Sequence, residues 1–451
     1  MTTFNDMNLT KPLREALEEM GYTTPTTIQQ KAFGPITGGQ NVLGIAQTGT
    51  GKTYAYLLPI LREWKFASKQ IPTIIIIVPT RELVVQVIDE FERLAKFTNM
   101  VITGAYGGAN IKSQMSDITA GVDVVVATPG RLLDLMLNGT ISSRHIKKLV
   151  IDEVDEMLNL GFRTQLQNLL DLLPLKKQTL MFSATITEEI EEWIHQNLTS
   201  PIRIEAASTG TPLKNITQIG YLVPNYNTKI NLLIHLLETD SEMTKVLVFA
   251  GSKRLADDVN DRMELDFPDQ LAVIHSNKSQ NTRFKTVSDF EDGKSRILIA
   301  SDLIARGIDV SSVSHVINMD LPLVPENYIH RIGRTGRADK TGIAISFITE
   351  SDEKKLEKIE ELMDMKIPIA PLPKGLEIST ILTPDEQPSL EMSTSEPKRK
   401  KKETKGAAFH EKKEKNQKVN VKVTRADKMK QKYGKRYEGD HRRSVLTPTF
   451  L

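Results

Sequence analysis

The sequence predicts an α/β protein with two tandem domains, each built on an open, mostly parallel β-sheet. The chain has 451 residues, which is too long for one small core. Short, nearly continuous apolar runs alternate with longer amphipathic stretches, the βαβ pattern of a sheet covered by helices on both faces. This alternation is interrupted once, near residues 206–216, by a segment of linker composition.

The expected strands are the apolar runs that helices would bury on both faces. In the first half of the chain they are residues 42–46, 73–78, 122–127, 149–151 and 179–182. In the second half they are residues 245–250, 271–274, 296–300, 313–317 and 343–348. Helical spacing marks residues 54–64, 81–96 and 130–137. We therefore expect a first domain at 1–205, a linker at 206–216, a second domain at 217–368, and a low-complexity segment and tail at 369–451.

Charge is distributed unevenly along the chain. From Glu396 to Leu451 there are 19 Lys/Arg and 7 Asp/Glu, a net charge of +12, while the rest of the chain carries −10. This tail has few large apolar residues, so we expect it to be disordered. Its charge makes it a candidate for additional contact with RNA or another polyanion, and a role in solubility alone stays open as the alternative.

Other classes of protein are excluded by what the sequence lacks. Without cysteine it cannot form disulfides, use thiol catalysis or bind zinc through thiolates. No apolar run approaches the ~20 residues of a membrane helix, and residues 1–12 lack the apolar core of a secretory signal. We expect a cytoplasmic protein with no membrane partner.

A phosphate-binding loop is predicted between the strand at 42–46 and the helix at 54–64. The segment Ala46–Thr53 has four free positions followed by Gly-Lys-Thr, and its glycines let backbone N–H groups face phosphate oxygens. Lys52 would reach the β- and γ-phosphates, and Thr53 would ligate Mg²⁺, so ATP and Mg²⁺ are the expected cofactors. The loop residues expected to bind ATP are Thr48, Gly49, Thr50, Gly51, Lys52 and Thr53.

An acidic pair and two arginines complete the predicted hydrolysis site. Asp152 and Glu153 directly follow the apolar run 148–151, so they project from the carboxyl end of a strand, where α/β sheets bind ligands. Asp152 would hold Mg²⁺, and Glu153 would orient or deprotonate the attacking water. Arg334 and Arg337 would reach the phosphates when two domains close over the nucleotide. A solvated acidic pair and a basic surface turn are the alternatives.

Together these motifs resemble those of the DEAD-box RNA helicases of helicase superfamily 2. The resemblance extends from about Phe4 to about Ile348. In the first half it rests on residues 21–29, Ala46–Thr53, Pro79-Thr80-Arg81-Glu82-Leu83, Gly107-Gly108, Thr128-Pro129-Gly130-Arg131, Asp152–Asp155 and Ser183-Ala184-Thr185. In the second half it rests on residues 248–253, Gln280 with Arg283, Ser301-Asp302, Arg306–Asp309 and His330–Arg337. It implies two RecA-like domains and an ATP-dependent RNA helicase that unwinds short duplexes or remodels RNA–protein complexes.

The resemblance also implies a role for each matching residue. Adenosine would be bound by Phe4, Tyr22, Gln29, Gly307 and Asp309. Catalysis would depend on Glu153, Lys52, Arg334 and Arg337, and coupling between the domains on Asp155, Ser183, Thr185 and His330. The RNA backbone would be contacted, independently of sequence, by Pro79, Thr80, Arg81, Gly107, Gly108, Thr128, Pro129, Gly130, Arg131, Ser252, Lys253, Arg283 and Ser301.

Several positions depart from the family pattern, among them Ser276, Ser301 and Asp339, and two alternative functions stay open. Val154 stands where the family has alanine, although the acids on both sides are intact. The alternatives are an ATP-binding RNA clamp that unwinds poorly and a DNA helicase. The intact Glu153 and Arg334 favour a helicase over a clamp. At ~1.4 kcal/mol per stacking step, ten steps amount to about 14 kcal/mol, so one domain closure would suit a short duplex.

Overall fold

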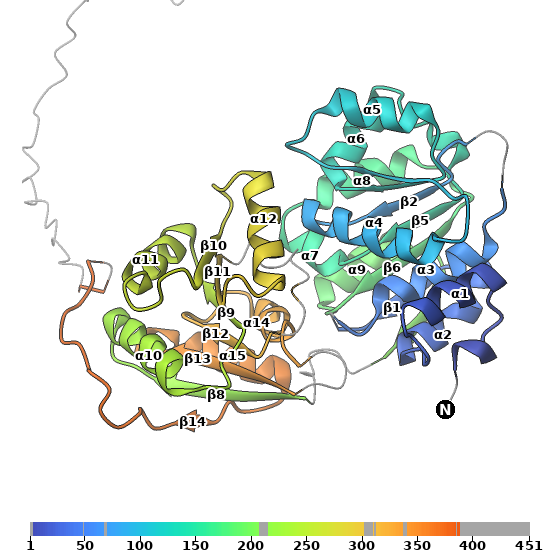
Figure 1. Ribbon diagram of the computed structural model, residues 1–451. Helices are drawn as coiled ribbons and strands as arrows, with labels where there is room; N and C mark the ends of the chain where they lie inside the picture. The colour runs from blue at the N-terminus through green and yellow to red at the C-terminus, as the bar shows by residue number, and fades with distance from the viewer. Residues whose placement is uncertain are drawn as a thin grey trace, which may run out of the picture. The chain divides into compact units, whose positions relative to one another are not determined.

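Two seven-stranded sheets of the same topology form the described part of the chain (Figure 1). The structure is a computed structural model and describes residues 3–47, 49–66, 70–206, 215–301, 310, 313–336, 341–384 and 386–387. The strand orders are β3-β4-β2-β5-β6-β1-β7 and β10-β11-β9-β12-β13-β8-β14, so the second repeats the first with each number raised by seven. Every pair of neighbouring strands in the two sheets is parallel, which confirms the predicted class of two parallel α/β sheets.

The strands are short and most are buried on both faces. The first sheet contains β1 Val42–Ile45, β2 Ile74–Ile77, β3 Ile102–Ala105, β4 Val124–Ala127, β5 Lys148–Ile151, β6 Gln178–Ser183 and β7 Ile202–Glu205. The second contains β8 Ile216–Leu222, β9 Val246–Ala250, β10 Leu271–Ile274, β11 Ile297–Ser301, β12 His315–Asn318, β13 Gly342–Ile348 and β14 Ile369–Ala370.

Helices connect successive strands and cover the sheets. Around the first sheet they are α1 Lys11–Glu19, α2 Thr27–Thr37, α3 Lys52–Glu63, α4 Arg81–Ala95, α5 Ile111–Ala120, α6 Pro129–Leu137, α7 Val154–Asn159, α8 Arg163–Leu172 and α9 Glu188–Asn197. Around the second they are α10 Tyr226–Thr239, α11 Lys253–Met263, α12 Gln280–Glu291, α14 Pro325–Ile332 and α15 Glu353–Met363. Short 3₁₀ turns are η1 Phe4–Asp6, η2 Ser143–His145 and η3 Glu350–Asp352. None of these helices has the length and apolar character needed to cross a bilayer.

The cores lie on both faces of each sheet, as the continuous apolar runs predict. Strand β2 consists of four isoleucines, all buried. Ile74 and Ile76 belong to the apolar cluster that also contains buried residues of α3 and α4, whereas Ile75 and Ile77 belong to the cluster with residues of α6, α8 and α9. Since successive side chains point to opposite faces of a strand, an unbroken apolar run requires a helical layer on each side.

Each of the ten predicted strands corresponds to an observed one, and the four that the sequence pattern missed lie at or beside a sheet edge. Strands β3, β7 and β14 are edge strands, and β8 pairs with β14. In β7 only Ile204 is buried, and in β8 buried and more exposed residues alternate. An edge strand is not buried on both faces along its length, so it does not form the continuous apolar run used to find the others.

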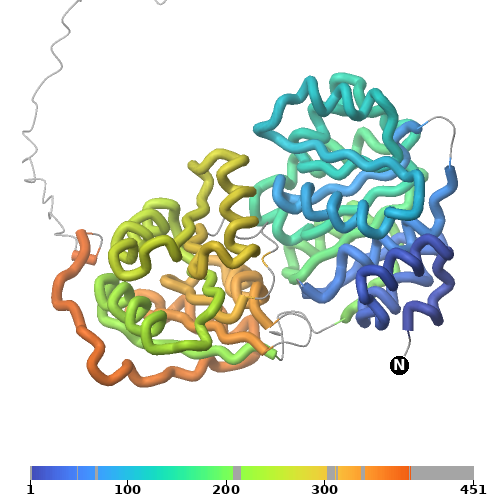
Figure 2. Tube along the Cα trace, viewed as in Figure 1, coloured from blue at the N-terminus to red at the C-terminus, as the bar shows by residue number. Residues whose placement is uncertain are grey.

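Ordered structure continues past Pro368, where the sequence places the end of the second domain. Strand β14 pairs with β8, and residues 371–384 with 386–387, here called the strap, then run along α10 (Figure 2). The side-chain amides of Asn225, Asn227 and Asn231 donate to strap carbonyl groups at 2.6–2.9 Å. The strap is attached by these hydrogen bonds and by two separate leucines, Leu372 and Leu376, that pack on the core, so it has no continuous apolar run that would have indicated a folded segment. The predicted basic tail, 396–451, lies outside the described residues.

The close contact between β1 and β6 yields a stability prediction. A Cβ on Gly44 would lie 2.5 Å from Phe182 Cε1, and Phe182 is fully buried. We expect Gly44→Ala to cost about 1–3 kcal/mol of unfolding free energy because the ring must shift. Gly34→Ala is the matched control, since nothing lies within 4 Å of its added methyl group in α2. Urea unfolding should show the first variant destabilised and the second unchanged or slightly stabilised.

Candidate active site

The phosphate loop connects β1 to α3 and is fixed by its own polar contacts. Gly49 and Gly51 have φ of 78° and 86°, a region that favours glycine. Thr50 Oγ1 donates to Gln47 O at 2.7 Å. Gln29 Nε2 donates to Gly51 O at 3.1 Å, and a side chain at Gly51 would collide with Gln29. The predicted adenine-reading glutamine is thus attached to the loop, while Thr48 lies outside the described residues.

Lys52 is a buried cation at the first turn of α3. Its side chain is 6% exposed, and its ammonium group has no hydrogen-bond partner in the described structure. Burying a lysine charge is costly unless a partner compensates it. The Lys52 charge acts on Asp152 and Glu153, lowering the pKa of each against the effect of burial. A phosphate group beside Lys52 would supply the hydrogen bonds that it lacks, so this residue fits a nucleotide.

The acidic pair lies where the sequence predicts, at the end of β5. Asp152 is 7% exposed, and its Oδ1 accepts from Glu153 N at 2.9 Å. Glu153 has φ 55° and ψ 52°, a left-handed conformation that is costly for a residue with a side chain. Burial, reinforced by the charge on Asp152, raises the pKa of Glu153 to about 7. Burial also raises the pKa of Asp152.

Asp155 joins the acidic strand end to the segment that follows β6. Its Oδ2 accepts from Ala184 N at 3.1 Å and from both the backbone N–H and the hydroxyl of Thr185 at 2.8 Å. Ser183 Oγ donates to Thr185 O at 2.7 Å. Burial acts to raise the pKa of Asp155, but the charges of His330 and Lys52, with these hydrogen bonds, hold it below its ordinary value. Asp155 therefore stays ionised and holds the segment in place.

Two residues of the second domain, His330 and Arg334, lie near this acidic strand end. His330, on α14, has Nε2 3.7 Å from Asp155 Oδ2 and Nδ1 3.4 Å from Glu156 Oε2. Burial acts to lower the pKa of His330, but the hydrogen bond with Glu156 and the charge of Asp155 outweigh it and raise that pKa. Arg334 is 5% exposed, and its charge lowers the pKa of Glu153. The predicted partners Gly307, Asp309 and Arg337 lie outside the described residues.

Phe4 and Tyr22, the predicted adenine contacts, line one pocket. It is bordered by Thr3, Phe4, Asn5, Arg14, Leu17, Glu18, Tyr22 and Thr23. Phe4 is buried and its N–H donates to Thr23 O at 3.1 Å, whereas Tyr22 is half exposed and packs edge-on against Tyr54. Gln29 does not line this pocket, because it contacts the phosphate loop instead. An exposed aromatic ring beside a pocket can accept a stacked base.

The segments predicted to contact RNA gather at one sheet edge. They follow β2, β3 and β4, which are neighbours in the first sheet, so parallel strands bring Thr80, Gly107 and Thr128 to the same side. Arg81 packs against Gly108, where a side chain would collide with its guanidinium group. Arg131 donates to Ala109 O at 3.1 Å, which joins two of the segments.

The second sheet repeats this arrangement. Ser252 and Lys253 follow β9, Ser301 ends β11, and these strands are neighbours as β2 and β4 are. Lys253 is exposed, and its Nζ donates to Asn277 Oδ1 at 3.2 Å. An exposed lysine and the hydroxyl groups of Ser252 and Ser301 suit phosphate contacts.

Arg283 has a different environment from the other predicted RNA contacts. It forms an ion pair with Glu82, and its side chain is 10% exposed. Gln280 Nε2 also donates to Glu82 at 3.1 Å, and Arg81 Nη1 donates to Gln280 Oε1 at 3.4 Å. Burial and the neighbouring charge of Arg81 lower the pKa of Arg283 to about 10. This ion pair connects α4, which covers the first sheet, to α12, which covers the second. Arg283 is therefore not open to solvent.

Sequence reasoning did not single out Glu82 or Glu156 as site residues. Both lie in the first turn of a helix, where acidic residues are common because they favour the helix dipole. Their position alone therefore gave no functional signal. Their burial and their cationic partners, which only the fold reveals, distinguish them.

Comparison with known proteins identifies the family. Residues 26–193 match the DEAD/DEAH box helicase family, and residues 228–339 match the helicase conserved C-terminal domain. The DEAD-box ATP-dependent RNA helicase RhpA of Helicobacter pylori is 37% identical over 371 residues, 82% of this chain and 74% of the relative. The ATP-dependent RNA helicase RhlB of Pseudomonas syringae pv. tomato is 38% identical over 375 residues, 81% of this chain and 94% of the relative.

Solved structures agree with these sequence matches. S. cerevisiae Dbp5 bound to RNA and ADP BeF3 superposes with a TM-score of 0.76 at 28% identity, covering 82% of this chain and 96% of that one. Mss116 bound to ssRNA and UDP-BeF superposes with a TM-score of 0.77 at 25% identity, covering 84% and 82%. The two parallel sheets are thus tandem RecA-like domains. This chain belongs to the DEAD-box helicase family, and it is an ATP-dependent RNA helicase.

Proposed function

We propose that this helicase hydrolyses ATP at the end of β5 and uses closure of its two domains to unwind short RNA duplexes or remodel RNA–protein complexes. The observation that carries the proposal is the position of His330 and Arg334. Both come from the second domain, yet His330 lies within 4 Å of Asp155 and Glu156, and the charge of Arg334 acts on Glu153. Hydrolysis would then depend on both domains, which RNA binding can bring together.

We assign Glu153 as the group that orients or deprotonates the attacking water. Its burial and its pKa of about 7 suit a general base, because a base works best with a pKa near the working pH. Lys52 would bind the β- and γ-phosphates, and Arg334 with Arg337 would stabilise charge that develops during phosphoryl transfer. Gln29, Tyr22 and Phe4 would hold the adenine, with Gly307 and Asp309 near the ribose.

The residues fit Mg²⁺ bound together with ATP. Mg²⁺ typically takes one or two protein ligands and fills its remaining positions with phosphate oxygens and water. Asp152 and Thr53 would be those ligands, and within the described ranges no group of three His, Asp or Glu side chains forms a separate metal site. When bound, the ion would neutralise phosphate charge. Asp155, Ser183, Thr185 and His330 would join this site to the second domain.

RNA would bind along the sheet edges formed by β2, β3 and β4 and by β9 and β11. The proposed contacts are Pro79, Thr80, Arg81, Gly107, Gly108, Thr128, Pro129, Gly130, Arg131, Ser252, Lys253 and Ser301. Hydroxyl groups, arginines and backbone N–H groups contact phosphates without reading sequence. We propose that Arg283 acts through its pairing with Glu82, next to Arg81, as a contact that forms when the domains approach.

Several finer features belong to the same proposal. Asp152–Asp155 would be a DEAD motif with valine at its third position, where Val154 is fully buried in an apolar cluster rather than aimed at the nucleotide. The domains would be 1–205 and 217–368, joined by 206–216, and β14 and the strap, at the start of the segment 369–451, attach to the second domain. We also propose a cytoplasmic location, and an RNA-tethering role for the basic tail at 396–451.

The proposal predicts a specific defect for Arg334→Ala. Because Arg334 belongs to the second domain, ATP binding should persist while RNA-stimulated hydrolysis falls by roughly 10³-fold or more, the range of an arginine finger. Arg262→Ala is the matched control, since this half-exposed arginine pairs with Asp258, donates to Asn227 Oδ1 at 2.7 Å and packs on Tyr226, none of which belongs to the proposed site. Steady-state ATPase assays with saturating RNA should separate the two. Normal stimulation of Arg334→Ala would show that hydrolysis does not use this residue.

Glu153→Gln should trap the complex instead of preventing its assembly. The amide keeps the side chain's size but cannot accept the proton of the attacking water, so ATP and RNA should bind together and dissociate slowly. Lys52→Ala should differ by losing tight ATP binding as well, because a buried cation is removed. Release of labelled RNA after dilution measures the lifetime. Rapid release from the ATP-bound Glu153→Gln protein would contradict the assigned role.

A truncated protein ending at Pro397 should test the tail. If about six tail cations engage single-stranded phosphates, they add a slope of roughly −4 to log affinity against log salt. The truncated protein should keep its ATPase rate at saturating RNA, need more RNA to reach half of it, and show a shallower salt dependence. Equal half-saturating RNA concentrations for both proteins at low and moderate salt would leave solubility as the tail's role.

A further inference from the structure

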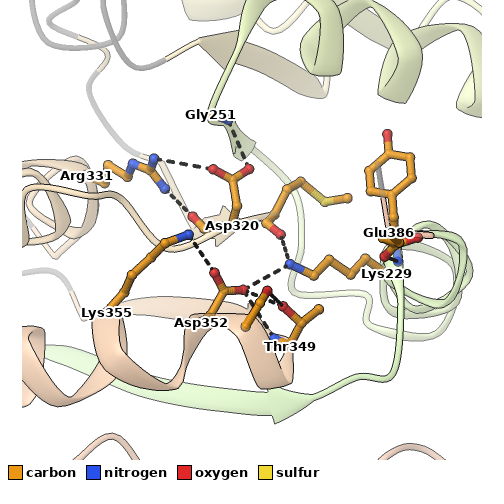
Figure 3. A network of polar contacts seen from close by, with 11 residues as sticks. Lys229, Gly251, Asp320, Arg331, Thr349, Asp352, Lys355 and Glu386 are labelled. Carbon is orange, nitrogen blue, oxygen red and sulfur yellow. Dashed lines mark hydrogen bonds and ion pairs between the residues drawn. The ribbon is translucent and has the colours of Figure 1, made fainter. Parts of the chain in front are cut away.

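Asp320 lies between two segments of the second domain that the proposed function assigns to different ligands. It follows β12 and is part of a polar network drawn in Figure 3. One carboxylate oxygen, Oδ1, accepts from Gly251 N at 2.9 Å. The other, Oδ2, lies 3.9 Å from Arg331 Nη2. A single carboxylate therefore contacts the end of β9 and the helix α14.

On the β9 side, the contact fixes the start of the proposed RNA-binding loop. Gly251 directly precedes Ser252, which caps α11 by accepting from Leu255 N at 3.2 Å, and Lys253, an exposed cation. A Cβ on Gly251 would collide with Asp320 Oδ2, so the approach of carboxylate to backbone requires glycine. Any displacement of this loop by RNA therefore acts directly on the carboxylate of Asp320.

On the α14 side, Asp320 contacts a buried arginine through its carboxylate and, more closely, through its backbone carbonyl oxygen. Arg331 is 2% exposed, donates to Asp320 O at 2.6 Å and to Asn318 Oδ1 at 3.1 Å, and lies over the ring of Phe249. Its planar guanidinium group has several fixed directions for donation, so its position is well defined. The preceding residue is His330, and Arg334 follows three residues later. The orientation of Arg331 therefore bears on both residues that face the acidic strand end.

The rest of the network is further from either ligand site. Lys229 is buried, donates to Met319 O at 2.7 Å, and lies 3.6 Å from Asp352 Oδ2. Lys355 donates to Asp352 Oδ1 at 2.7 Å. These contacts join α10 to η3 and α15, which carry no proposed RNA or nucleotide residue. Asp352 provides a comparison within the same network, because it is a carboxylate that lies beside a buried cation but in the described structure contacts neither the loop at Ser252 nor α14.

We propose that Asp320 is a positioning residue that couples RNA binding at Ser252 and Lys253 to the placement of His330 and Arg334. The proposal rests on the function proposed above, which assigns those two pairs of residues to RNA and to nucleotide. The carboxylate holds the loop and the arginine in one relative position, so RNA that orders the loop also favours the α14 position needed at the phosphates. Asp320 itself touches neither ligand.

The test measures how strongly the binding of RNA and the binding of nucleotide are coupled in the full-length Asp320→Asn protein. The asparagine amide has the size of the carboxylate. Its oxygen can accept from Gly251 N only if its NH₂ group turns toward the guanidinium group of Arg331, so one side chain can no longer bind both partners. The measurement is the dissociation constant for a single-stranded RNA, with and without a non-hydrolysable ATP analogue. Their ratio is the coupling factor, which is typically 5–150-fold. We expect Asp320→Asn to lower this ratio at least fivefold.

Two further variants make the outcome decisive. Gly251→Ala should give the same loss, because its methyl group displaces the carboxylate while Asp320 remains. Asp352→Asn is the matched control and should lower the thermal midpoint but keep the wild-type ratio. The proposal is overturned if Asp320→Asn keeps the wild-type ratio, or if Asp352→Asn loses it equally.

A separate variant tests the assumption that the loop at Ser252 and Lys253 binds RNA. Lys253→Ala should weaken RNA binding in the presence of the ATP analogue. If it does not, the RNA assignment of this loop fails, and with it the role proposed for Asp320. If Lys253→Ala weakens binding while Asp320→Asn keeps its coupling factor, the RNA assignment stands and only the positioning role fails.

Discussion

The parallel direction of all strands is the constraint on which the rest of this structure depends. Parallel strands end at one edge, so the segments that follow them are brought together whatever their separation in the sequence. In the first sheet the order places β3, β4 and β2 on one side and β5, β6 and β1 on the other. The proposed RNA segments follow the first group and the nucleotide segments follow the second. The second sheet repeats that order, so each domain presents both kinds of segment along one edge.

Buried charge is the second organising feature, and residues of both sheets contribute to it. Lys52, Asp155 and Glu156 are almost wholly buried, and so are His330 and Arg334 from the second sheet. Isolated buried charges are strongly unfavourable, so each depends on partners of opposite sign. The acidic strand end supplies partners for His330, whereas Lys52 has no hydrogen-bond partner in the described structure. A nucleotide phosphate would complete the set, so ligand binding and domain contact stabilise each other.

The sequence predicted the interior of both sheets and the strand ends at which the proposed site lies, and it failed where burial is partial. Strands such as β2 are recognisable because helices cover both faces, whereas β7 and β14 have exposed residues and no distinctive pattern. Site residues on loops after buried strands, such as Asp152, were predictable from position and chemistry together. The partner of Arg283 was not, because Glu82 lies 201 positions away in the chain and only the fold brings them together. The strap was missed for a similar reason: polar side chains of α10 attach it.

RNA stimulation follows from these features if RNA and nucleotide favour the same arrangement of the domains. RNA that contacts the edges of both sheets would hold the segments after β2 and β9 in a fixed relative position. In the same arrangement α14 lies against the end of β5. A coupling free energy of about 1–3 kcal/mol between the two ligands would change either affinity about 5–150-fold. That energy must be carried by contacts whose geometry differs between the open and closed arrangements. The ion pair of Arg283 with Glu82 and the contacts of His330 with Asp155 and Glu156 have this property, because each forms only when the domains meet. The connection proposed for Asp320 lies within the second domain, between the loop at Ser252 and Lys253 and the helix that carries His330.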